Sequence, residues 1–206
     1  LYSVKRIAGN NRFETAVYIG EEIISQAPQI DTVIIATGYN YPDTLAIAPF
    51  AGRHRIPILF TETDTLNETT KHALAVWQVK KAIIAGGTRV VSRQIEETLK
   101  SDLQMEVTRL AGDNRYLTCL EIAKHFEKSA AMSKYQRAAL ATGTNFPDAL
   151  AGASLAAKYN CPVLLVTKDS IGPETQNYLK SLNPEIIYIF GGENAISDQV
   201  ILDLNT

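Results

Sequence analysis

The sequence predicts an α/β fold made of two tandem units, each with a roughly four-stranded parallel sheet flanked by helices. Short apolar, β-branched runs alternate with segments of helical periodicity along the whole chain. One stretch also occurs twice, as Ala-Thr-Gly-Tyr-Asn-Tyr-Pro-Asp-Thr-Leu-Ala at residues 36–46 and Ala-Thr-Gly-Thr-Asn-Phe-Pro-Asp-Ala-Leu-Ala at residues 141–151. The shift between the copies is 105 residues, about half of the chain, so the second half repeats the first.

The first unit alternates four strands with four helices. Strands are predicted at residues 3–8, 32–36, 57–60 and 81–85. Helices are predicted at residues 13–27, 44–53, 66–76 and 92–103. Residues 3–8 alternate only weakly between polar and apolar side chains. The run at residues 32–36 is short, continuous, apolar and β-branched, which suits a parallel strand buried on both faces.

Side chains at the helix starts and one internal proline refine this prediction. Asp43 is a natural N-cap for the second helix, and Ser92 is one for the fourth. Pro49 is expected to bend or interrupt the second helix, because proline cannot donate a backbone hydrogen bond.

The unit then restarts, since residues 107–116 repeat residues 4–13 at a shift of 103. Further strands are predicted at residues 137–141, 162–166 and 185–190, and Ser197 is expected to cap the last helix. We therefore place the first unit at residues 1–104 and the second at residues 105–206. No Gly/Ser-rich linker separates them, so the two units are expected to pack against each other.

Three motif pairs survive between the halves, and all lie where a strand ends and a helix begins. They are Arg6–Thr15 with Arg109–Thr118, the duplicated stretch above, and Ile84–Gly87 with Ile189–Gly192. In a parallel sheet these ends share one edge, where α/β proteins place their ligand sites. The edge is therefore the predicted binding region.

The repeated residues have both structural and binding interpretations. Positive φ in the turns is expected for Gly9, Gly38, Gly86, Gly112, Gly143 and Gly191, and the structural motifs also include Gly87 and Gly192. Asp43 and Asp148 suit helix caps, and Asn40 and Asn145 suit turns. Arg12 and Arg115 suit pairing with a carboxylate across the interface between units, or contact with a ligand.

Composition and motifs exclude several functions. The net charge of −2 excludes a strong electrostatic footprint for DNA or RNA, and no apolar run approaches the ~20 residues that span a bilayer. The two cysteines, Cys119 and Cys161, occupy apolar repeat positions and are predicted to be buried free thiols. Three scattered His predict neither a zinc site nor a general base, and no known nucleotide or hydrolase motif occurs, so no cofactor is expected.

The three motifs resemble the cell wall binding repeat type 2 family of surface-layer proteins and autolysins in Gram-positive bacteria. They read Arg-Leu-Ala-Gly-Asp-Asn-Arg-Tyr-Leu-Thr, Ala-Thr-Gly-Thr-Asn-Phe-Pro-Asp-Ala-Leu-Ala and Gly-Gly with a following Ser, in the order that the family has. The resemblance covers nearly the whole chain as two repeats. It implies Rossmann-like or Toprim-like units and non-covalent anchoring of a secreted protein to an anionic cell-wall glycopolymer. It also implies that the repeats are not catalytic, and that any enzyme domain lies elsewhere in the parent protein.

Family members usually carry three repeats, whereas this chain has two. Either a third repeat or self-association is therefore expected to complete a pseudo-trimer. The chain begins without Met or a signal-peptide core, so we expect it to be a processed or excised piece of a protein at the cell surface.

The residues predicted to contact the polymer are Arg12, Asn40, Arg115 and Asn145, with Arg6 and Arg109 behind them. Two other interpretations remain open. One is a small-molecule enzyme that binds a sugar phosphate or a nucleotide at the same edge of the sheet. The other is an architectural module, in which the repeated residues only hold the units together.

Overall fold

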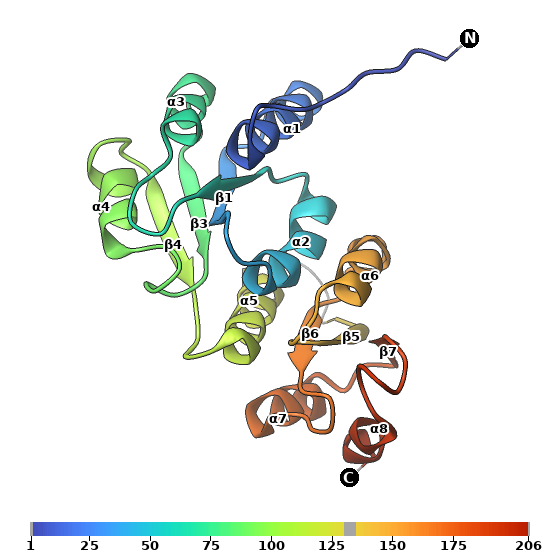
Figure 1. The fold of residues 1–206 in the computed structure, drawn as a ribbon. Coiled ribbons are helices and arrows are strands. Elements are labelled where there is room, and N and C mark those ends of the chain that lie inside the picture. Colours follow the sequence, from blue (N-terminus) through green and yellow to red (C-terminus); the bar gives the residue numbers. More distant parts are fainter. Residues whose placement is uncertain (1, 130–134, 206) are drawn as a thin grey trace.

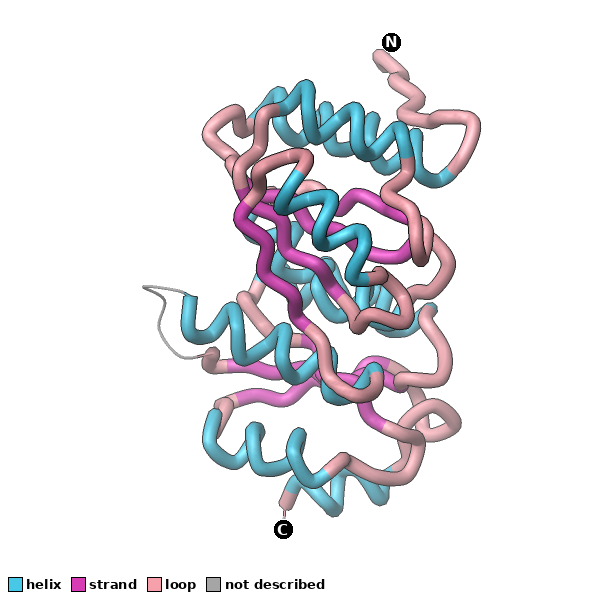
Figure 2. The backbone as a smooth tube through the Cα atoms, turned by 90° about the vertical axis from the view of Figure 1, so that its left-hand side faces the viewer, coloured by secondary structure: helices cyan, strands magenta, loops and turns pink. Residues whose placement is uncertain are grey.

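A computed structural model describes residues 2–129 and 135–205. Two parallel sheets follow one another along the chain, each flanked by helices, as the sequence predicts (Figure 1). The two units are stacked along one direction, with the termini at opposite ends (Figure 2).

The first sheet has four strands in the order β2-β1-β3-β4. Its strands are β1 (Thr32–Thr37), β2 (Ile58–Thr61), β3 (Lys81–Ala85) and β4 (Glu106–Leu110). Its helices are α1 (Arg12–Gln26), α2 (Pro42–His54), α3 (Glu68–Trp77) and α4 (Arg93–Ser101). The strands predicted at residues 32–36, 57–60 and 81–85 are confirmed to within one residue.

The second sheet has three strands in the order β6-β5-β7. Its strands are β5 (Arg137–Thr142), β6 (Val163–Val166) and β7 (Ile186–Phe190). Its helices are α5 (Arg115–Ser129), α6 (Pro147–Lys158), α7 (Pro173–Leu182) and α8 (Asp198–Leu204).

The two sheets differ in size because β4 belongs to the repeated sequence of the second unit but pairs with the first sheet. Glu106 to Leu110 run parallel to Lys81 to Ala85 along β3. The equivalent residues of the first unit, 3–8, form no strand, so that prediction is wrong. They are a largely exposed segment that passes along α1, where Lys5 pairs with Glu22, and the chain before it extends away from the body of the protein (Figure 1). A strand at this position needs a neighbouring sheet edge, which β3 offers to β4.

Two local predictions about α2 are also wrong. The N-cap residue is Tyr41 and not Asp43, which lies in the first turn and makes no capping bond. The helix also runs through Pro49 without interruption, because tertiary packing buries Pro49 and outweighs the missing hydrogen bond. Ser92 and Ser197 do occupy N-cap positions, but their hydroxyl groups make no capping bond.

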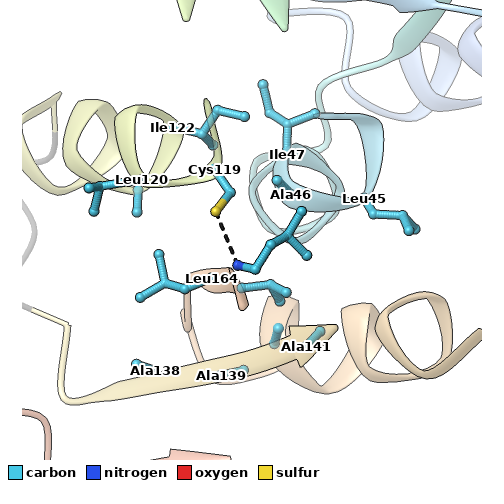
Figure 3. Close-up of a cluster of buried hydrophobic side chains, with 14 of the residues drawn as sticks. Leu45, Ala46, Ile47, Cys119, Leu120, Ile122, Ala138, Ala139, Ala141 and Leu164 are labelled. Carbon is cyan, nitrogen blue, oxygen red and sulfur yellow. Dashed lines mark hydrogen bonds between the residues drawn. The ribbon is translucent and has the colours of Figure 1, made fainter. Parts of the chain in front are cut away.

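A continuous apolar core joins the two units. Helices α2, α5 and α6 lie between the two sheets (Figure 1), and α2 packs against α5, α6 and β6. The rings of Phe50 on α2 and Phe126 on α5 stack with centroids 4.5 Å apart. Cys119 lies in this core, where its sulfur accepts a hydrogen bond of 3.1 Å from the Leu165 N–H (Figure 3). The two units therefore pack on each other through a shared core, as predicted from the absence of a linker.

Both cysteines are free and buried, which confirms the prediction from their apolar repeat positions. Burial raises the pKa of each thiol to about 12. A thiol with such a high pKa is not a nucleophile near neutral pH, so both cysteines serve the core.

Candidate functional site

A cavity of about 540 Å³ opens between the two repeats, at the carboxyl edge of the first sheet. It is lined by Asn40, Pro42, Asp43, Gly87, Thr88, Arg89, Val90, Gly112, Asp113, Asn114, Arg115 and Thr118. Three of the motif turns meet here, two from the first repeat and one from the second, because β4 brings the opening motif of the second repeat to the first sheet.

Three adjacent strands position the lining. Asn40 follows β1, the Gly87–Val90 turn follows β3, and the Gly112–Arg115 segment follows β4. Since these three strands are neighbours and parallel, their carboxyl ends place the segments side by side. The sequence-based prediction that the motif turns share one edge is confirmed for these three.

Arg115 begins α5 and lines the cavity. One of its guanidinium nitrogens donates to the carbonyl oxygen of Gly143, in the duplicated stretch of its own repeat. Arg12 makes the equivalent bond to the carbonyl oxygen of Gly38 and lies over the ring of Tyr39. Each arginine therefore fixes the turn of its own repeat, and the remaining guanidinium N–H groups have no partner among the described hydrogen bonds.

Arg89 is a second cation at the cavity. It follows the Gly86-Gly87 turn, is exposed, and donates to the backbone carbonyl of Asp113 at 3.1 Å. This bond ties the first repeat to the second across the cavity. Arg89 was not among the predicted contacts, because its repeat equivalent is Asn194 and comparison of the two halves highlights only shared residues.

Asp43 is the carboxylate that lies deepest at the site. It is half-buried beside Gly86, where a Cβ would lie 2.7 Å from its Oδ2 atom. Burial raises the pKa of Asp43 above its usual value, and the nearby Arg115 offsets part of this rise. The cavity therefore combines two guanidinium groups with one carboxyl group of perturbed pKa.

Asn40 lines the cavity as predicted, and its side-chain oxygen accepts from the Tyr41 N–H at 2.9 Å. Asn145 makes the equivalent bond to Phe146 but lies outside this cavity. The two copies of the duplicated stretch contact each other nearby, because the Tyr41 hydroxyl donates to the Thr144 carbonyl at 3.1 Å. The rings of Tyr41 and Phe146 also lie 5.2 Å apart.

Arg109 is held within the protein. It pairs with Glu96 at 2.8 Å and donates to the carbonyl oxygens of Gly86, Val91 and Ser92. These bonds fasten β4 to the turn and helix after β3. Pairing with a carboxylate across the repeats was expected for Arg12 and Arg115, and it is Arg109 that makes such a pair, with Glu96. Arg6, its equivalent, is exposed on the extended N-terminal segment.

The repeated glycines separate into three groups. Gly86 and Gly191 have positive φ, as predicted. The prediction of positive φ is wrong for Gly9, Gly38, Gly112 and Gly143, which instead lie where a Cβ would come within 2.2–3.0 Å of a neighbouring side chain. Gly87 and Gly192 have neither feature, since a Cβ at either position would meet nothing within 4 Å.

The cavity can bind but offers few groups for catalysis. Among the described residues that line it, none is His, Cys or Lys. Guanidinium, amide and hydroxyl groups predominate, and these hold acidic and hydroxyl-bearing ligands by hydrogen bonds.

Comparison with known proteins identifies the family. The model of cell wall binding domain 2 (CWB2) matches residues 6–96 and 109–201, which together are most of the chain. The chain belongs to the CWB2 family. This finding confirms the resemblance, and the two matches fall on the two predicted units, separated at residues 97–108 where β4 begins.

Two relatives from Bacillus subtilis align with nearly the whole chain. The chain is 36% identical over 198 residues to the N-acetylmuramoyl-L-alanine amidase LytC of Bacillus subtilis, covering 96% of this chain and 38% of the relative. It is 35% identical over 195 residues to the amidase enhancer of the same organism, covering 95% and 25%. The chain thus spans between a quarter and two fifths of the length of these relatives.

Solved structures confirm the CWB2 fold. Cwp6 from Clostridium difficile aligns with a TM-score of 0.88 and 31% identity, over 97% of this chain and 31% of that one. Cwp8 from the same organism aligns with a TM-score of 0.81 and 28% identity, over 96% and 32%. The protein is accordingly a cell wall binding module. No helix in the described ranges is long and apolar enough to cross a membrane.

Proposed function

We propose that this module anchors a secreted protein, such as an autolysin or a surface-layer protein, to an anionic polymer of the Gram-positive cell wall. The observation that carries this proposal is the cavity between the repeats, where Arg89 and Arg115 lie with Asn40 and Asn114. Guanidinium groups bind phosphate and carboxylate by charge-assisted hydrogen bonds, and amides bind sugar hydroxyls. Binding holds the ligand without changing it.

Both repeats contribute residues to the cavity, so a polymer bound there would contact both of them. Asn40 and Arg89 belong to the first repeat, and Asn114 and Arg115 to the second. Several weak contacts along a repetitive polymer would add up to useful affinity. Arg12 and Asn145 occupy the equivalent motif positions and are proposed to contact further stretches of the same polymer, with Arg6 exposed beside them.

The experiment is sedimentation of the protein with purified Gram-positive cell walls, before and after extraction of the anionic polymer. We expect extraction to abolish binding, and added salt to weaken it because exposed charges are screened. Arg89→Ala is expected to weaken binding severalfold. Arg93→Ala is the matched control, because Arg93 is an exposed arginine that lies outside the cavity. Binding that persists on extracted walls would contradict the proposal.

We also propose that another repeat of the same fold covers the free faces of the two units. Strand β3 has two neighbours, whereas β7 has one within the described residues, and Ile187 to Phe190 are only half-buried. The segment 3–8 repeats the sequence of β4 and has no sheet to join. A further unit would pair with β7 through its own opening strand and accept residues 3–8 at its own last strand.

Apolar side chains support the same arrangement. On α2, Leu45 and Phe50 are 7% and 2% exposed, but their equivalents on α6, Leu150 and Leu155, are 57% and 36% exposed. A groove of about 450 Å³ on the first unit is lined by apolar residues that include Ile19, Ile23, Ile58 and Phe60. The equivalents of these four in the second unit are buried, at least in part by α2.

The further repeat comes either from the parent protein or from a second copy of this chain, and molar mass in solution distinguishes the two. Association that rises with concentration and is abolished by Leu155→Glu would indicate a second copy. A monomer in which residues 3–8 and the β7 backbone exchange hydrogen rapidly would place the further repeat in the parent protein. A monomer in which both segments are protected would contradict the proposal.

A further inference from the structure

Two residues that line the cavity, Gly87 and Asp43, are retained at the equivalent positions of the second repeat. Gly87 is retained at the equivalent position as Gly192, yet neither has positive φ and a Cβ at either position would meet nothing within 4 Å. Folding therefore does not require glycine at position 87. Because Gly87 lines the cavity, a side chain there would only obstruct what enters it.

Asp43 is the second such feature. It is retained as Asp148, makes no capping bond, and accepts no hydrogen bond in the described part of the chain. A half-buried carboxylate without donors is costly, and the rise in its pKa reflects this cost. A ligand that donates hydrogen bonds to Asp43 would remove the cost.

The groups around Asp43 define what such a ligand must carry. Arg115 and Arg89 lie at the same cavity, so an acidic group is favoured close to a hydroxyl donor. A bare anion would be repelled by Asp43, and a neutral sugar would supply no acidic group to the two guanidinium groups, which donate only to backbone carbonyls among the described hydrogen bonds. The Gly87 and Thr88 N–H groups, which donate in none of the described hydrogen bonds, lie on the same lining.

We infer that the cavity is a subsite for a single sugar residue that carries a phosphate or carboxylate group, with its hydroxyls on Asp43, its acidic group on Arg89 and Arg115, and its ring against the bare backbone of Gly87. This inference rests on the proposed function and specifies which unit of the polymer is recognised. Asp43 sets the requirement for a hydroxyl, the arginines set the requirement for an acid, and Gly87 provides the space.

The second repeat carries only part of this set. Asp148 and Gly192 correspond to Asp43 and Gly87, but Thr88 and Arg89 are replaced by Glu193 and Asn194. An equivalent site there would gain one carboxylate and lose one guanidinium group. The cavity between the two repeats is therefore the stronger acid-binding subsite of this chain.

The test is titration of the purified protein with glucose 6-phosphate, glucuronate, glucose and inorganic phosphate, followed by calorimetry and by NMR shifts. At least one acidic sugar should bind roughly tenfold more tightly than glucose and than phosphate, a difference of about 1.4 kcal/mol. The two acidic sugars distinguish phosphate from carboxylate as the preferred group. Equal binding of phosphate and both acidic sugars, or no binding of any probe, would overturn the inference.

Variants assign the roles. Gly87→Val should abolish binding of the acidic sugar, whereas Gly192→Val, the control at the equivalent open position, should leave it unchanged. Asp43→Asn should reduce the affinity for the acidic sugar to that for inorganic phosphate without lowering the latter. Circular dichroism confirms that each variant is folded. Wild-type affinities in Gly87→Val and Asp43→Asn would overturn the inference.

Wall sedimentation of the same samples keeps the two proposals separate. If the wild type binds walls through the anionic polymer but binds no acidic sugar, the subsite inference fails and the proposed function stands. If it binds the acidic sugar but not the walls, the proposed function fails and the subsite stands.

Discussion

Phe50 on α2 and Leu155 on α6 occupy equivalent positions in the two repeats, but their surroundings differ. Phe50 is 2% exposed and stacks on Phe126 of the following repeat, whereas Leu155 is 36% exposed. The sequence around both positions is similar, so the difference comes from the neighbour and not from the repeat itself. The apolar face of α2 is buried because the second repeat covers it.

The opening strand gives the same comparison. Arg109 on β4 is held by Glu96 and three backbone carbonyls, whereas Arg6 lies on an exposed extended segment. The arginine of the opening motif is thus a structural clamp in the second repeat, where it joins β4 to the segment after β3, but it makes no such bonds in the first repeat. The repeat as read from sequence is therefore not the unit of folding, because the first sheet takes its fourth strand, β4, from the sequence of the second repeat.

The largest expected effect comes from truncating the buried member of the first pair. Phe50→Ala should lower the free energy of unfolding by about 3 kcal/mol, because it removes a fully buried ring and leaves a cavity between the units. Leu155→Ala should cost less than about 1 kcal/mol, since exposed sites tolerate truncation. Urea denaturation measures both, and equal losses would show that the two faces are covered alike in solution.

The second pair tests the clamp. Arg109→Ala should destabilise the protein by about 2 kcal/mol, because Glu96 and three carbonyl groups lose their partner in a half-buried site. Arg6→Ala should change stability by less than about 0.5 kcal/mol. Hydrogen exchange should localise the loss to β4 and the end of β3. Protection that falls equally throughout the chain would argue against a local clamp.

Features internal to a repeat should behave alike in both halves. Gly86 and Gly191 have φ of +119° and +122°, and a Cβ at either would lie 2.7–2.8 Å from the carboxylate of Asp43 or Asp148. Gly86→Ala and Gly191→Ala should therefore each cost about 1–2 kcal/mol through backbone strain and crowding. A large difference between them in thermal unfolding would mean that the neighbouring repeat also supports this turn.

Most strands and helices could be predicted because their signals are local. Short apolar runs locate β1, β3, β5 and β7 to within one residue. The strand predicted at residues 3–8 is absent. Its sequence resembles that of β4, but a strand at this position also needs the edge of a neighbouring sheet, which the local sequence does not reveal. The prediction that Asp43 caps α2 is also wrong. The carboxylate of Asp43 lies against Gly86, which is distant in the sequence, and not at the start of the helix.

The candidate site was only partly predictable from the repeated residues. Asn40 and Arg115 come together at the cavity as expected, but Arg89 has no counterpart in the second repeat and gave no repeated signal. Arg109 is also repeated, as the equivalent of Arg6, and yet it is engaged in structural bonds. Repetition identifies residues that the fold or the ligand requires, and only the contacts in three dimensions distinguish these two.

The smallest expected effect is the pH dependence of the clamp. Lys100, and with it Arg109, lowers the pKa of Glu96 below the ordinary value of 4.5. The folded protein therefore binds fewer protons at Glu96 than the unfolded chain does. This contribution is fully present above pH 4.5 and is lost as the pH falls through the lower pKa of the folded state. Since both ion pairs are partly solvated, the loss should be below about 1 kcal/mol.

The second repeat has Ile201 at this position and no such pair. Glu96→Gln should consequently flatten the acid limb of the stability profile, whereas Glu97→Gln, at an exposed neighbour outside the ion pairs, should leave it unchanged. An acid limb unaffected by Glu96→Gln would mean that hydrogen bonds to the backbone carbonyls, and not the carboxylate, hold Arg109 in place.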